Sequence, residues 1–191
     1  MPSAEAHFDT CQTPAAWRLF DQNHPPCAAT SLIYLLEDSA GRLLLNDGEP
    51  LYPGGLYIGP QTLAPRTEPG SSIQGIQIST TATAVQRLCK TQIPVVIAPG
   101  SRTRLLAGQI DTCDSPLPWP GALIDLRLDT GFPWTSPCKQ TARVIVIAGE
   151  LHCGDTPMPA GGEYALSASA TLHAGQRSHA LIWLAPPTSG N

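Results

Sequence analysis

Charged side chains are scarce in this 191-residue chain, which holds 11 Lys and Arg, 15 Asp and Glu, and a net charge of -4. Binding to nucleic-acid phosphates needs a concentrated basic surface, and the few cations here form no run along the sequence. The chain also lacks the Gly-x-Ser-x-Gly elbow, the phosphate loop and the dinucleotide fingerprint. We therefore expect no nucleic-acid partner and no nucleotide chemistry.

Long apolar segments are absent as well. Stretches such as 144–148 are far shorter than the roughly 20 residues that cross a bilayer, and residues 1–10 lack the basic and apolar regions of a signal peptide. These features predict a cytoplasmic protein without a membrane partner. Its six cysteines, none in a Cys-x-x-Cys pair, are then expected to remain thiols and to act as small apolar or loop residues.

What the chain does contain is short strand patterns separated by turns, with 20 prolines and 17 glycines spread along its length. Several of these patterns alternate apolar and polar residues, which is typical of half-buried strands. The expected strands are 31–36, 56–58, 73–78, 95–98, 122–128, 143–147 and 180–184. Only 14–20 and 82–90 have patterns that tolerate a helix.

One turn pattern occurs twice. The sequence Gly-Gly-Leu-Tyr at 54–57 recurs as Gly-Gly-Glu-Tyr at 161–164, and each copy lies between two expected strands. A glycine pair permits the positive φ that swings a chain from one strand into the next. Two copies of one strand order predict two similar small antiparallel barrels, a closed arrangement that leaves few strand edges exposed.

The order of these segments resembles the pirin family. The run HPPCAATSLIYLLEDSAG from His24 is similar to the pirin segment that begins His-Pro-His and enters a strand, and 51–78 is similar to the family's Pro-Gly-Asp turn and the strands after it. Segment 93–109 resembles the crossing between the barrels, and segments 122–137 and 143–187 resemble the second barrel. The resemblance implies an all-β fold of two antiparallel cupin (jelly-roll) barrels in tandem, with little helix. The expected domains are an N-terminal barrel, 1–105, and a C-terminal barrel, 106–191.

Pirin-like proteins hold iron in the first barrel through three His and one Glu, and some oxidise flavonols with molecular oxygen. The resemblance places the first of these His at His24 and the glutamate at Glu68, but Pro26 and Arg66 stand at the other two positions. Proline offers no donor atom and arginine stays cationic, so neither binds a divalent ion. We expect a degenerate metal pocket within 24–68 and no resident cofactor. A small molecule or a protein partner would be bound there by His24, Arg66 and Glu68.

Two alternatives stay open, and with them the question of whether the protein is an enzyme. The first is a metal-dependent cupin oxygenase or isomerase, similar to quercetin dioxygenase, holding divalent iron, nickel, copper or zinc through His24, Glu68 and Cys27. The second is a redox-sensing adaptor that uses an exposed thiol. Arg66 also has two open roles: binding a ligand carboxylate, or pairing with Glu68 two residues along the same strand face.

Three histidines lie in the second half of the chain: His152, His173 and His179. Residues six apart share a strand face only if no turn separates them, and Gly175 falls between His173 and His179. We expect all three to be surface or hairpin residues rather than a metal cluster.

Overall fold

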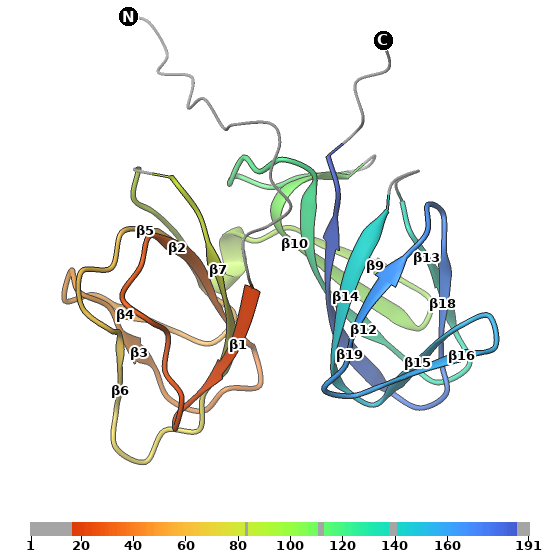
Figure 1. Cartoon of the computed structure of the whole chain (residues 1–191), viewed down its shortest axis with the longest axis horizontal. Coiled ribbons are helices and arrows are strands. Elements are labelled where there is room, and N and C mark those ends of the chain that lie inside the picture. The colour runs from red at the N-terminus through yellow and green to blue at the C-terminus, as the bar shows by residue number, and fades with distance from the viewer. Residues whose placement is uncertain (1–16, 83, 111–112, 138–140, 187–191) are drawn as a thin grey trace, which may run out of the picture. The chain divides into compact units, whose positions relative to one another are not determined.

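The structure, a computed structural model, describes residues 17–82, 84–110, 113–137 and 141–186 (Figure 1). The regular secondary structure of these residues is β-strand, apart from one short 3₁₀ helix, η1 (Lys90–Gln92). This confirms the predicted all-β class with little helix. In the described part of the chain no helix has the length and apolar character needed to cross a membrane.

The chain divides into two compact units, Met1–Gln92 and Ile93–Asn191. The division lies before residue 105, the expected end of the first barrel. Its position follows from a long strand, β10 (Ser101–Ile110), which pairs with β12 (Ala122–Leu128) over most of its length. Since a paired strand belongs to one sheet, the whole of β10 is part of the second unit.

The first unit contains two antiparallel sheets. Its strands are β1 (Trp17–Asp21), β2 (Ser31–Leu35), β3 (Leu43–Leu44), β4 (Pro50–Leu51), β5 (Leu56–Gly59), β6 (Arg66–Thr67), β7 (Gln74–Ser79) and β8 (Gln86–Leu88). The larger sheet has the order β1-β7-β2-β5-β8 and the smaller one β4-β3-β6. Side chains from both sheets meet in one apolar core: Phe20, Ile33, Leu35, Leu43, Leu45, Leu51, Tyr57 and Ile73.

The second unit repeats this plan with longer strands. Besides β10 and β12 they are β9 (Val95–Ala98), β11 (Cys113–Asp114), β13 (Pro133–Thr135), β14 (Ala142–Ala148), β15 (Glu150–Cys153), β16 (Thr156–Pro159), β17 (Glu163–Leu166), β18 (Thr171–Ala174) and β19 (Ser178–Leu184). One sheet runs β11-β10-β12-β19-β14-β17, with β9 paired to β10, and the other runs β13-β18-β15-β16. Alternate residues of both sheets, such as Ile124, Val144 and Leu172, fill the core between them. Each such burial contributes about 1.5–3 kcal/mol.

The repeated turn has the same geometry in both units. The first glycine of 54–57 has a φ of +78° and that of 161–164 a φ of +83°. In each copy the last part of the preceding strand exchanges two backbone hydrogen bonds with the glycine pair, through Leu35 in one unit and Val146 in the other. The N···O distances are 2.8 and 3.1 Å in both units. One sequence signal therefore builds the same strand-to-strand connection twice.

All seven expected strands are present. The two stretches whose patterns tolerate a helix contain strands in their described parts: β8 lies within 82–90, and β1 begins within 14–20. The helical spacing of apolar residues in 82–90 is overridden because β8 pairs with β5, with Leu88 opposite Leu56. Residues 14–16 lie outside the described part of the chain.

Candidate functional site

The loop that carries His24 is closed by Asp21, the last residue of β1. The Asp21 Oδ1 atom accepts hydrogen bonds from the backbone N–H groups of His24 and Asn23, both at 2.8 Å. These bonds, above all the one from His24, lower the pKa of the Asp21 carboxyl. The His24 ring lies over the same carboxylate, with its Nδ1 at 3.2 Å from Oδ1, and its side chain is 74% exposed. His24 is thus part of a surface turn.

Cys27 is fastened to strand β7 by the side chain of Gln77. The backbone N–H of Cys27 donates to Gln77 Oε1 at 2.8 Å, and Gln77 Nε2 donates to the Cys27 carbonyl at 2.9 Å. The Cys27 sulfur accepts a hydrogen bond from Arg18 Nη1 at 2.6 Å. Its thiol is therefore engaged by an arginine, and neither His24 nor Glu68 is its partner.

Glu68 pairs with Arg42, and not with Arg66. The Arg42 Nε donates to Glu68 Oε1 at 2.6 Å, and its Nη2 contacts the same oxygen. The carboxylate raises the pKa of the Arg42 guanidinium. The two residues meet because Arg42 directly precedes β3, Glu68 directly follows β6, and these two strands pair in the small sheet. Of the two roles open for Arg66, pairing with Glu68 is not the one observed.

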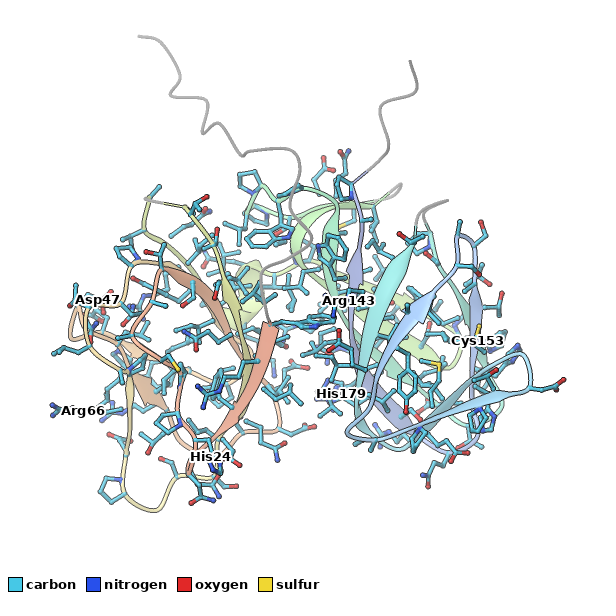
Figure 2. The ribbon with its side chains drawn as sticks, viewed as in Figure 1. His24, Asp47, Arg66, Arg143, Cys153 and His179 are labelled. Atoms are coloured by element: carbon cyan, nitrogen blue, oxygen red, sulfur yellow. The ribbon has the colours of Figure 1, made fainter. Side chains whose placement is uncertain are left out.

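Arg66 lies in the wall of a wide cavity of about 550 Å³. Leu63, Ala64, Pro65 and Thr67 form one side of it, and Pro25 comes from the His24 loop. Of the residues predicted to bind a ligand or metal, only Arg66 is part of this lining, and His24, Cys27 and Glu68 are not. Arg66 is exposed, and within the described ranges it has no ion-pair partner. Figure 2 shows the His24 and Arg66 side chains projecting from different parts of the first unit.

These residues do not fit the iron site of the pirin family. His24, Cys27 and Glu68 each bond to a different neighbour, and Pro26 and Arg66 supply no metal donor. Throughout the described part of the chain, no three His, Cys, Asp or Glu side chains converge in a way that could hold a metal ion. The donor set is dispersed, and the wall of the cavity presents one cation, Arg66, among mostly apolar side chains.

A second cavity of the first unit, of about 220 Å³, lies between the turn at 50–55 and the segment 87–91. Cys89 belongs to its wall and is exposed. The Thr91 hydroxyl oxygen lies 3.2 Å from the Cys89 sulfur, and this contact lowers the pKa of the thiol. In the sequence, Cys89 is not distinguished from the other cysteines. The only signal for it in the sequence is the Cys-x-Thr spacing. That spacing indicates a contact between the thiol and the hydroxyl only once η1 is known to follow Cys89.

The other cysteines differ in setting. Cys27 is exposed and free, whereas Cys113 and Cys153 are half-buried and free. Cys11 and Cys138 lie outside the described residues.

The histidines of the second unit differ from one another more than expected. His173 is exposed and His152 is half-buried, in agreement with surface positions. His179 is buried, with 8% exposure, and its Nε2 lies 2.8 Å from Oδ1 of the buried Asp125. The prediction of a surface position is wrong for His179, because β19 begins immediately after the hairpin and carries this residue into the sheet.

Solved structures with the same architecture include quercetin 2,3-dioxygenase from Acinetobacter baumannii, with 16% identity over 93% of this chain and 69% of that one, and a TM-score of 0.66. GK1651 from Geobacillus kaustophilus has 15% identity over 92% of this chain and 82% of that one, with a TM-score of 0.65. The bacterial pirin YhhW from Escherichia coli, solved in complex with nickel(II), has 14% identity over 91% and 76%, with a TM-score of 0.58.

The protein therefore has the tandem-barrel cupin fold, and a pirin is among the proteins that share it. No protein-family model and no curated protein matches the sequence. Similarity at this level of identity defines the fold, so the function is argued from the residues of this chain.

Proposed function

We propose that the protein binds a small carboxylate-bearing molecule in the Arg66 cavity of the first unit, without turnover at a metal. The observation that carries this proposal is the state of Arg66. It is an exposed cation in a cavity wall, and the nearest carboxylate along the chain, Glu68, is bonded to Arg42. A guanidinium in this position has its planar set of donors available for the two oxygens of a carboxylate.

The rest of the cavity indicates the kind of molecule that would fit. Leu63, Ala64, Pro65 and Pro25 offer apolar surface, and Thr67 adds one hydroxyl. The space of about 550 Å³ is an open surface depression, so a small ligand bound there would keep part of its surface in water. An apolar wall with one cation favours an amphipathic acid, whose hydrocarbon or aromatic part packs on the prolines while its carboxylate meets Arg66.

Benzoate is a suitable probe, with benzyl alcohol as its neutral counterpart of the same shape. We expect benzoate to bind and Arg66→Ala to weaken it by about 10–100-fold, since hydrogen bonds to charged groups contribute about 1.5–3 kcal/mol. Arg66→Lys keeps the charge but loses the planar fork, and should fall between. Isothermal titration calorimetry or chemical-shift perturbation measures the affinities.

Arg177→Ala is the matched control, because Arg177 is also an exposed arginine but lies in the other unit. Equal benzoate affinity in the Arg66→Ala variant, or equally tight binding of benzyl alcohol, would refute the carboxylate role. Elemental analysis of the same purified protein tests the metal half of the proposal. One equivalent of iron, nickel, copper or zinc that is lost in both His24→Ala and Glu68→Gln would instead support the oxygenase or isomerase alternative.

A second role, regulation through a thiol, is favoured by one observation, the lowered pKa of the exposed Cys89. A lowered pKa increases the thiolate fraction at neutral pH, and the thiolate is the reactive form. We expect iodoacetamide to alkylate Cys89 at pH 7 several-fold faster in the wild type than in Thr91→Val, in which the hydroxyl is lost but the shape is kept.

The rate is followed by mass spectrometry of the Cys89 peptide between pH 6 and 10. The wild-type profile should rise at lower pH than that of Thr91→Val, since removing the donor moves the thiol pKa back up. Coincident profiles would remove the reason for singling out Cys89.

The cytoplasmic location expected from the sequence stays a prediction.

A further inference from the structure

The small sheet of the second unit brings two histidines directly opposite each other. Strands β15 and β18, both labelled in Figure 1, form an antiparallel pair. Their register places His152 opposite His173. Directly opposite residues on one face of an antiparallel pair have Cβ atoms about 4.5–5.5 Å apart. Leu151 and Leu172 belong to the core of the unit, so alternation turns both imidazoles to the outer face of the sheet.

Glu150 fixes the state of the His152 ring. The His152 Nε2 lies 2.7 Å from Oε1 of Glu150, two residues earlier on the same strand and on the same face. A carboxylate oxygen accepts and does not donate, so Nε2 is the donor in this contact, and Nδ1 is the ring nitrogen left to face a metal ion. A carboxylate that receives one ring N–H while the other nitrogen is left to bind is the arrangement that orients metal-ligating histidines.

The surroundings leave room beside this pair. Gly175 follows β18 opposite Glu150, with its N–H donating to the Glu150 carbonyl at 3.2 Å. A Cβ on Gly175 would lie 3.1 Å from His152 Nε2, so any other residue would crowd the ring. On the outer flanks Pro133 pairs with His173 and Pro157 with His152, and neither proline has a side-chain donor that competes for the imidazoles.

We propose that His152 and His173 bind a divalent transition-metal ion on the outer face of this sheet, with Glu150 as the residue that positions His152. Imidazole nitrogen suits zinc, copper and nickel, and water completes the coordination of a site with two protein ligands. No group of three such donors occurs among the described residues, so the proposed site has two protein ligands and Glu150 is not a third. The site belongs to the second unit and is distinct from the Arg66 cavity of the first.

Copper(II) is the most sensitive probe, because it binds nitrogen sites most tightly of the divalent first-row ions. We expect one equivalent to bind the full-length protein, with an electron paramagnetic resonance spectrum that shows two imidazole nitrogens. His152→Ala and His173→Ala should each reduce this to one nitrogen and weaken binding by at least about tenfold. His24→Ala is the control, because His24 is an exposed histidine in the other unit.

Copper binding that is unchanged in His152→Ala and His173→Ala, or that is lost in His24→Ala, would overturn the proposal. Circular dichroism of each variant shows whether the fold is kept, and both substitutions are outside the core. Glu150→Gln should weaken binding by about 10–100-fold with both nitrogens retained. In the wild type, two-dimensional ¹H–¹⁵N spectra of the imidazoles should report the Nε2–H form of His152, and a fixed Nδ1–H form would contradict the positioning role.

The double variant His152→Ala/His173→Ala separates this proposal from the proposed function. Metal that remains in the double variant is bound at another place, and it bears on the first unit only if it is lost in both His24→Ala and Glu68→Gln. Metal that disappears from it belongs to the outer sheet and leaves the Arg66 proposal untouched.

Discussion

Gly108→Ala is expected to lower the free energy of unfolding of the second unit by about 2–5 kcal/mol, the sum of backbone strain and a steric clash. Gly108 has a φ of +83°, in the left-handed region that a residue with a Cβ adopts at a cost. A Cβ there would lie 2.0 Å from the carbonyl oxygen of Gly121. That oxygen cannot move aside freely, because it accepts the N–H of Gln109 at 3.3 Å and precedes β12. Chemical denaturation followed by circular dichroism measures the loss.

Gly131→Ala is the matched control in the same unit. Its φ of +80° is nearly the same as that of Gly108, but no atom lies within 4 Å of the position that its Cβ would take. Only the backbone strain remains, so the expected cost is about 1–2 kcal/mol. The difference between the two variants isolates the clash with Gly121. If both variants lost the same stability, close approach of β10 and the segment before β12 would not be what requires a glycine at 108.

β10 is also the longest of the strands that the sequence did not predict. The segment 101–110 has neither a clean alternation nor a continuous apolar run, because Arg102 and Arg104 alternate with polar residues before Leu105 and Leu106. A register shift between Leu105 and Ala107 breaks the period inside the strand. The shorter strands, β2, β5, β7 and β12 among them, were found because their patterns keep one period throughout. The strand β14 also has a register shift, but the shift lies near its end, between Val146 and Ala148, and the apolar run 144–147 stays recognisable.

At the candidate site, the sequence likewise indicates features that lie within one continuous segment, but not contacts between distant segments. The resemblance located the two segments that line the Arg66 cavity, since each is a continuous piece of sequence. It could not give the partner of Glu68, because Arg42 reaches it only through the pairing of β3 with β6. Likewise, His152 and His173 are far apart in the sequence, and only the register of β15 and β18 places them opposite each other. The sequence therefore indicates the residue types at these positions, but not which residues are partners across neighbouring strands.

Asp125→Ala should be the most damaging single change in the polar part of the second unit, at about 3–5 kcal/mol. Asp125 is 1% exposed and accepts from His179 Nε2. Arg104, also 1% exposed, lies directly opposite Asp125 in the register of β10 and β12. Removing the carboxylate leaves a buried imidazole without this acceptor and a buried guanidinium without the negative charge opposite it. Asp125→Asn keeps the shape and an acceptor oxygen, and should cost less.

His179→Ala is expected to cost less than Asp125→Ala, because the carboxylate still lies opposite the cationic Arg104 when the imidazole is gone. In the double variant Asp125→Ala/His179→Ala the loss of stability should be smaller than the sum of the two single losses. The cost of leaving the imidazole without its acceptor disappears when the imidazole itself has been removed. The coupling energy from urea denaturation of the wild type, both single variants and the double variant measures this contact. Additive losses would mean that the 2.8 Å contact contributes nothing of its own. Equal single losses would mean that Arg104 does not depend on Asp125, and the buried charges of this sheet would need another account.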